Sequence, residues 1–130
     1  MKFESIHIKG KGRGKQMGFP TINLKIPDNF ELKDGVYATK VTVENKIFIG
    51  ALHYGPVPTF TEQEKSLEVY LVGLTTNELV DYELENPSEK IIKVEIVKYL
   101  RPVIKFRLVE SLVKQIKEDV INIKRITNNQ

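Results

Sequence analysis

The chain has 130 residues, of which 41% are hydrophobic and 28% are charged, and its formal net charge is +3. This length fits one domain with its own hydrophobic core, and the composition excludes wholesale disorder. The absence of cysteine excludes disulfides and thiolate metal sites, and no apolar run approaches the roughly 20 residues that span a bilayer. We therefore expect a cytoplasmic protein, and the small excess of cations does not by itself indicate a nucleic-acid partner.

The first predicted element is a strand over residues 3–8. Loose alternation along this strand places Ile6 and Ile8 on one face and His7 on the opposite, polar face.

A glycine-rich loop with interspersed cations follows. Glycines at alternate positions let backbone N–H groups approach an anion closely, so the loop can hold a phosphate. Lys15 stands where a dinucleotide fingerprint needs glycine, and Gln16 stands where a P-loop needs serine or threonine. From these residues alone, a phosphate loop between strands and a mobile hairpin with solvated cations are equally consistent. The loop consists of Gly10, Lys11, Gly12, Arg13, Gly14 and Lys15.

A short polar strand is predicted over 21–24, directly after Pro20. Thr21 and Asn23 share one face of it, because they are two residues apart. Hydroxyl and amide oxygens are neutral ligands that suit Mg²⁺, which keeps further positions for phosphates and water. Such ligands beside a phosphate loop predict a nucleotide-using enzyme.

The middle of the chain is typical of short strands separated by turns. A tight turn is expected at 44–46, and a proline-rich loop is expected at 55–60. The further strands are expected at residues 36–43, 47–52, 67–74 and 90–100.

Near the C-terminus the hydrophobic period changes to that of an amphipathic helix. Six strands followed by one helix predict a mostly-β domain over residues 1–126, in which an antiparallel sheet closes as a small barrel and the helix packs on it. Residues 127–130 are expected to be a frayed tail. The apolar residues that define the helix are Leu108, Leu112, Ile116, Val120 and Ile123.

Glu68 and Tyr70 share the face of strand 67–74 that is opposite to its leucines and valine. A glutamate on an outward strand face is most often simply solvated. The functional alternative is a general base that accepts a proton from a substrate hydroxyl during phosphoryl transfer. Sequence spacing does not decide whether Glu68 lies near Thr21, because only the fold can bring the two strands together.

The stretch from Gly10 to Leu24, GKGRGKQMGFPTINL, resembles the opening signature of riboflavin kinases of the bacterial and eukaryotic type. Its Gly-Phe-Pro-Thr-x-Asn core is the most specific part, and later landmarks follow in the order of the family. The resemblance covers residues 6–125 and implies a six-stranded antiparallel Greek-key barrel with a C-terminal helix, in agreement with the strand pattern. The later landmarks lie at 35–38, 55–60, 67–69, 99–102, 105–106 and 111–119.

The resemblance implies transfer of the γ-phosphate of ATP to the 5′-hydroxyl of riboflavin, giving FMN and ADP, with Mg²⁺ as cofactor. It implies that Glu68 is the catalytic base and that Thr21 and Asn23 bind Mg²⁺ and the nucleotide phosphates. The other nucleotide-binding residues that it implies are Gly10, Gly14, Lys15 and Pro20. The flavin-binding residues that it implies are Arg101, Lys105, Phe106, Leu108 and Leu112.

The chain departs from the family pattern near this site. Tyr70 replaces the usual histidine, His53 replaces an asparagine, Val103 replaces an acid, and residues 72–77 lack the usual ending Leu-Tyr-Gly. These changes spare the implied base and metal ligands, so we expect activity to survive. A structural hydrogen bond is expected for His53 rather than catalysis. The aromatic residues Tyr37, Tyr54 and Phe60 could stack on a flavin ring, although plain core packing is the more common role of such residues.

Two alternatives to the kinase stay open. The first is a catalytically silent flavin- or nucleotide-binding module, and the second is a small basic barrel that binds nucleic acid, although interleaved aromatic and basic residues are missing. We expect small-molecule substrates, no nucleic-acid or membrane partner, and a monomer. Bacterial relatives commonly carry an adenylyltransferase domain before this module, and the sequence contains none. We therefore expect no FAD synthesis.

Overall fold

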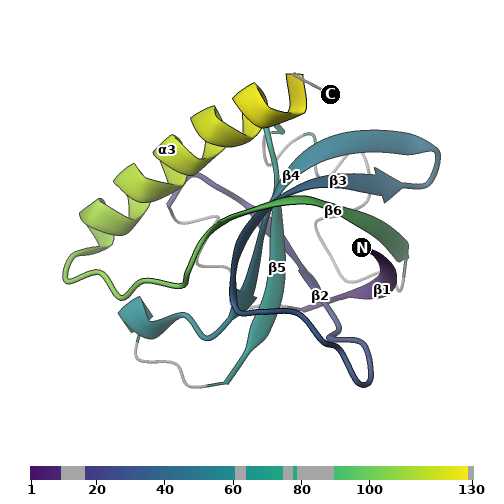
Figure 1. Ribbon diagram of the computed structural model, residues 1–130, viewed down its shortest axis with the longest axis horizontal. Helices are drawn as coiled ribbons and strands as arrows, with labels where there is room; N and C mark the ends of the chain where they lie inside the picture. The colour runs from purple at the N-terminus through teal and green to yellow at the C-terminus, as the bar shows by residue number, and fades with distance from the viewer. Residues whose placement is uncertain (10–16, 61–63, 75–77, 79–89, 129–130) are drawn as a thin grey trace.

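The computed structural model describes residues 1–9, 17–60, 64–74, 78 and 90–128. Within these ranges six strands and one long helix carry the fold (Figure 1). The strands are β1 (Lys2–Ile8), β2 (Thr21–Leu24), β3 (Gly35–Val43), β4 (Lys46–Gly55), β5 (Ser66–Leu71) and β6 (Ile91–Arg101). The short 3₁₀ helix η1 (Pro58–Phe60) precedes β5, and the helix α3 (Val109–Asn128) follows β6.

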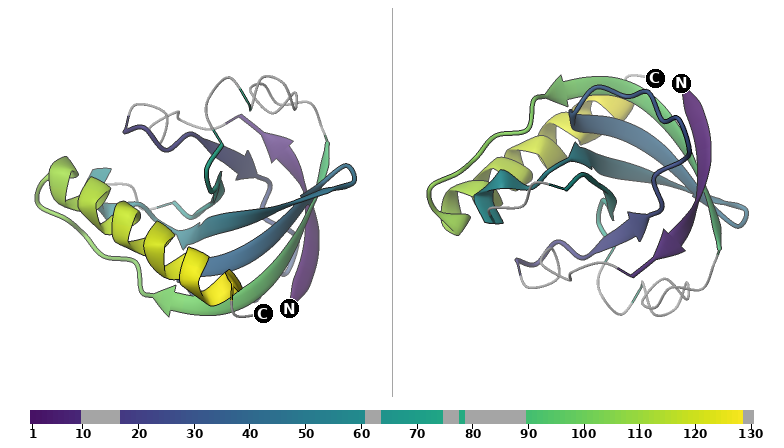
Figure 2. Two further views of the ribbon diagram at one scale, coloured as in Figure 1. Left: turned by 90° about the horizontal axis from the view of Figure 1, so that it is seen from above. Right: turned by 90° about the horizontal axis from the view of Figure 1, so that it is seen from below.

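The strands form a closed antiparallel barrel in the order β1-β2-β5-β4-β3-β6, and β6 pairs back with β1. Strands β3, β4 and β5 are consecutive neighbours, and β2 lies on the far side of β5, which is a Greek-key arrangement. Helix α3 lies along one side of the barrel, where it contacts β4 and β3 (Figure 2). The predicted barrel with a C-terminal helix is confirmed.

The strand boundaries agree with the prediction at β2 and differ at β4 and β5. Strand β4 continues past the expected end, because its last residues still pair with the start of β5, Tyr54 with Leu67 and Gly55 with Ser66. Strand β5 ends three residues earlier than expected, and the chain turns at Gly73, where φ is +87°.

Alternate side chains of the strands fill the barrel interior. Ile22, Leu24 and Val69 are at most 1% exposed. Tyr37 and Tyr54 belong to the same core, with 4% and 5% of their surface exposed. These two tyrosines are therefore packing residues of the barrel, and the side chain of Phe60 lies outside the described part of the chain.

The inward face of β1 is opposite to the predicted one. Phe3 packs edge-on against Phe30, with ring centroids 4.9 Å apart, and His7 is only 5% exposed, whereas Ile8 is 39% exposed. The pairing of β1 with β6 and β2 fixes which residues face inward, and the phenylalanine ring takes the interior position rather than Ile8. The prediction that His7 lies on the polar face is therefore wrong.

Helix α3 buries a narrow stripe against the barrel, where only Asp119 and Ile123 among its residues are fully buried. It continues through Thr127 and Asn128, which were expected to be frayed, and the Thr127 hydroxyl donates to the carbonyl of Ile123 at 2.8 Å. Among the described residues, no helix has both the length and the apolar character to span a membrane.

Close packing around Gly50 generates a first prediction. A Cβ atom at this position would lie 2.7 Å from Thr39 Oγ1 and from a methyl carbon of Val69. We expect Gly50→Ala to lower the free energy of unfolding by about 1–3 kcal/mol, because the extra methyl overpacks the barrel. Urea denaturation measures this loss. Ile47→Ala, at a site 70% exposed on the same strand, is the control and should change stability by only about 0.5 kcal/mol. Equal midpoints for the two variants would contradict the packing argument.

The buried His7 generates a second prediction. Burial lowers the pKa of this imidazole from its ordinary value, so between the two values the unfolded chain binds a proton that the folded chain does not. The free energy of unfolding should be constant above pH 6.5 and should decrease as the pH falls below about 6.5.

Denaturation midpoints measured between pH 5 and pH 8 test this expectation. His7→Leu should flatten the decrease, and the remaining slope near pH 6 belongs to His53, the other histidine of the chain. An unchanged slope in the His7→Leu variant would exclude His7 as its source.

Candidate active site

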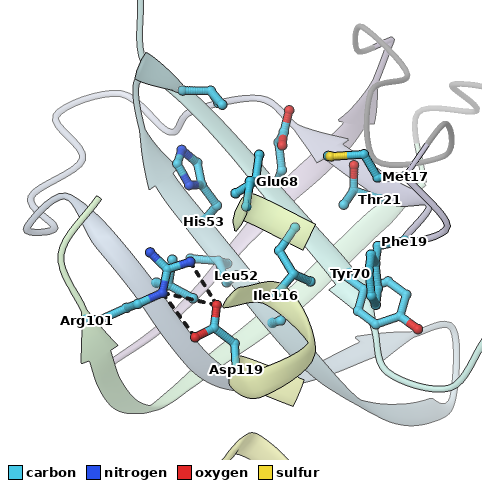
Figure 3. Close-up of a pocket in the computed structure, with 14 residues that line it drawn as sticks. Met17, Phe19, Thr21, Leu52, His53, Glu68, Tyr70, Arg101, Ile116 and Asp119 are labelled. Carbon is cyan, nitrogen blue, oxygen red and sulfur yellow. Dashed lines mark hydrogen bonds and ion pairs between the residues drawn. The ribbon is translucent and has the colours of Figure 1, made fainter. Parts of the chain in front are cut away.

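A pocket opens on the outer face of the barrel, on the side that α3 covers (Figure 3). Residues of β2, β3, β4, β5 and α3 and the last residue of β6 line it. Most of the lining is apolar, and the polar groups are few and distinct in kind. They are Thr21, His53, Glu68, Tyr70, Arg101 and Asp119.

The register of β2 with β5 brings the predicted base and metal ligands together. Asn23 is the direct cross-strand partner of Glu68, and Thr21 is that of Tyr70. Directly opposed residues have Cβ atoms about 4.5–5.5 Å apart, and diagonal neighbours are still within reach of long side chains. Thr21 and Glu68 both line the pocket, so the fold supplies the proximity that sequence spacing could not.

The same transverse row continues across the next three strands. Glu68 pairs with His53, His53 pairs with Val36, and Val36 pairs with Arg101. A carboxylate, an imidazole and a guanidinium therefore stand in one line on the pocket face. Asn23 extends this line beyond the carboxylate.

Arg101 is tied to helix α3 by an ion pair with Asp119. The Nε and Nη2 groups of the arginine donate to both carboxylate oxygens at 2.8–3.1 Å. The Gln115 amide donates to the same carboxylate at 3.0 Å, one turn earlier on the helix. The side chains of Arg101 and Asp119 are only 15% and 5% exposed. This pair joins the helix to the end of β6 and lies in the pocket wall.

His53 is a neutral polar group in the middle of the row. Its Nε2 lies 3.0 Å from the carbonyl oxygen of Gly55, and because a carbonyl only accepts, Nε2 carries the proton. Burial lowers the pKa of His53; the hydrogen bond to Gly55 opposes this, and the positive charge of Arg101 reinforces it. The expected structural hydrogen bond is present.

Aromatic side chains form the end of the pocket next to Thr21. The rings of Phe19 and Tyr70 meet edge to face, with centroids 5.3 Å apart. Met17 lies beside them in the lining. The two ends of the pocket therefore differ, since one has aromatic and hydroxyl groups and the other has the Arg101–Asp119 ion pair.

The structure brings some of the predicted ligand-binding residues to this pocket and not others. Arg101 and Leu112 line it, whereas Lys105, Phe106 and Leu108 do not. Leu108 is 59% exposed, and the backbone N–H of Phe106 donates to the Thr59 hydroxyl at 3.0 Å.

On the nucleotide side, Pro20 is buried between two lining residues, Phe19 and Thr21. The predicted loop residues Gly10, Gly14 and Lys15 lie outside the described part of the chain.

Asp119 is a residue of the site that the sequence analysis did not predict. The sequence nevertheless indicates that this residue is unusual, because its carboxylate falls on the apolar face of the helix, between Ile116 and Ile123. An acid at such a position needs a buried partner. The identity of that partner, Arg101, depends on how the helix lies across the barrel.

The side-chain oxygens near Glu68 suit a hard cation that receives most of its ligands from phosphates and water. Thr21 and Asn23 offer neutral oxygens on one face of β2, close to one carboxylate. Among the described residues there is no group of three or more histidine, cysteine, aspartate or glutamate side chains that could hold a metal. Mg²⁺ commonly binds through one or two protein ligands and completes its shell with phosphates and water.

Comparisons with known proteins identify the fold and the family of the chain. In the solved structures, a macrolide-efflux protein from Streptococcus pneumoniae matches with a TM-score of 0.74 and 25% identity, over 99% of this chain and 38% of that one. The RNA-binding riboflavin kinase RibR of Bacillus subtilis is 34% identical over 114 residues, which cover 87% of this chain and 45% of that protein. The bifunctional riboflavin kinase/FMN adenylyltransferase of Listeria monocytogenes is 32% identical, over 86% of this chain and 33% of that protein.

This chain thus spans less than half the length of these curated relatives. The family model for riboflavin kinase (flavokinase) matches residues 1–127. Since this match covers nearly the whole barrel and its helix, the chain belongs to the riboflavin kinase family.

Proposed function

We propose that this domain transfers the γ-phosphate of ATP to the 5′-hydroxyl of riboflavin, giving FMN and ADP. The observation that carries the proposal is the β2–β5 register, which sets Asn23 opposite Glu68 and places Thr21 two residue pairs further along, on the same face. Membership of the riboflavin kinase family and the names of the similar proteins support the same reaction.

Glu68 is the general base of the proposed reaction. Its carboxylate accepts the proton of the 5′-hydroxyl as the hydroxyl oxygen bonds to the γ-phosphorus, and the bond from that phosphorus to the leaving oxygen of ADP breaks. Its cross-strand neighbours, Asn23 and His53, are both neutral at pH 7. Neither of them adds a positive charge that would reduce the basicity of the carboxylate.

The Thr21 hydroxyl and the Asn23 amide oxygen are the residues that would hold Mg²⁺. When bound there, the ion neutralises negative charge on the phosphates of the nucleotide. The placement of both oxygens on the base's side of β2 supports this assignment.

The two ends of the pocket suggest where each substrate binds. We assign the phosphates of ATP to the end at Thr21 and Pro20, which follow the glycine-rich segment with Gly10, Gly14 and Lys15 in the sequence. We assign riboflavin to the end at Arg101 and Leu112, because its uncharged ring suits the apolar wall there. Glu68 then lies between the phosphate donor and the acceptor hydroxyl.

Removing the base tests the reaction directly. We expect Glu68→Gln to lower kcat by roughly 10²–10⁴-fold, because glutamine keeps the shape of the side chain and cannot accept the proton. The measurement is chromatographic detection of FMN formed from riboflavin, ATP and Mg²⁺. Glu64→Gln, at an exposed acid just before the same strand, is the matched control. Full turnover in the Glu68→Gln variant would remove Glu68 from the mechanism.

Removing the hydroxyl ligand tests the assignment of the metal. We expect Thr21→Ala to raise the concentration of Mg²⁺ needed for half-maximal FMN formation, and to leave riboflavin affinity unchanged, because Thr21 lies at the opposite end from Arg101. Thr42→Ala, on β3 and outside the pocket lining, is the control. A Thr21→Ala variant with the Mg²⁺ requirement of the wild type would contradict the assignment.

Tight flavin binding without FMN formation in the wild-type protein would instead favour the catalytically silent binding module.

A further inference from the structure

We propose that Asp119 is a positioning residue that fixes Arg101 as a two-donor recognition group for adjacent acceptor atoms of the flavin ring. The inference rests on the proposed function, since it takes riboflavin to be the molecule in this end of the pocket. It adds an assignment for Asp119 and a statement of which ring atoms are recognised.

The hydrogen bonds of Arg101 leave two donors uncommitted. A guanidinium has five N–H groups. One on Nε and one on Nη2 point to Asp119, and one on Nη1 points to the carbonyl of Pro102 at 3.1 Å. Among the described residues no further acceptor engages Arg101, so Nη1 and Nη2 each keep one N–H. Neighbouring donors of this kind match a ligand with two neighbouring acceptors.

The position of the ion pair aims these donors at the substrate. In Figure 3 Asp119 lies on one side of the guanidinium and His53 lies toward the other side, where the pocket continues to Glu68. The carboxylate holds one edge of the guanidinium by both oxygens, which fixes the plane of the group. The remaining edge is therefore held toward the pocket rather than free to rotate.

A second hollow beside the Arg101–Asp119 pair indicates which movement of the Arg101 guanidinium the carboxylate prevents. Arg101 and Asp119 also line a groove between β6 and α3, which contains Lys98 and Arg125. Without its partner, the guanidinium could turn into this open groove, where water would solvate its charge. The Gln115 amide, bound to the same carboxylate, holds Asp119 in place.

The charges of the pair also select the kind of ligand. Asp119 neutralises Arg101 within a mostly apolar wall, so this end of the pocket attracts no excess of anions. A neutral heteroaromatic ring with paired acceptors fits this environment. The isoalloxazine ring offers two such pairs, O4 with N5 and O2 with N1, whereas its N3–H group is a donor and cannot face Arg101.

Calorimetric titration with riboflavin tests the positioning role. We expect Asp119→Asn to weaken riboflavin binding about tenfold, since loss of one charge-assisted hydrogen-bond partner is of that size. The KM for ATP should not change, because the nucleotide binds at the other end. Glu118→Gln, the exposed acid next to it on α3, should bind riboflavin like the wild type. Equal loss of riboflavin and ATP affinity in the Asp119→Asn variant would indicate a merely structural role.

The ring atoms are tested with Arg101→Lys and two analogues, 5-deazariboflavin and 1-deazariboflavin, each of which has a C–H group in place of one acceptor nitrogen. The wild-type protein should bind one analogue about tenfold more weakly than riboflavin, because a donor is then left unpaired. The Arg101→Lys variant should lose this discrimination. Equal discrimination by the wild type and the variant, or none by the wild type, would overturn the inference.

The outcomes of these experiments distinguish failure of this inference from failure of the proposed function. A wild-type protein that binds no riboflavin at all would refute both. A protein that binds and phosphorylates riboflavin without discriminating either analogue would refute this inference alone. The analogue comparison in the wild type also stands if Asp119→Asn fails to fold.

Discussion

The antiparallel register of β2 with β5 is the constraint on which the site depends. Because side chains alternate between the two faces of a strand, a shift of one residue would send Thr21 and Asn23 into the barrel and Ile22 and Leu24 to its surface. Burial of the two apolar side chains, each 1% exposed, therefore also holds the two polar ones outward. Burial of the apolar side chains thereby determines which polar side chains reach the outer face.

The other half of the site depends on the ion pair between β6 and α3. The strands of the barrel supply one wall of the pocket, and the helix supplies the second wall. Arg101 and Asp119 fix where that wall stands, with few other buried residues to help them. A buried ion pair contributes little net stability, because both charges lose their hydration, so the main effect of this pair is to fix the position of the helix on the barrel.

Much of the fold followed from the sequence, because strand alternation, turn residues and the change to helical spacing are local signals. The face of β1 did not follow, since Phe3 and Ile8 compete for the interior and only the pairing partners decide between them. In the site, Thr21, Asn23 and Glu68 could be named from their motifs, but their proximity required the strand order. Asp119 was visible as a misplaced acid on an apolar helical face, and its partner could not be named before the helix was placed on the barrel.

The barrel strands are held more firmly than helix α3, so the helix should detach before the barrel unfolds. Every strand of the barrel is paired on both sides, whereas among the described residues α3 is held by the Arg101–Asp119 ion pair and a narrow apolar stripe. We therefore expect detachment of the helix to cost less free energy than unfolding of the barrel. If the domain binds riboflavin as proposed, mild denaturation should abolish that binding while the paired strands that carry Thr21, Asn23 and Glu68 are still intact.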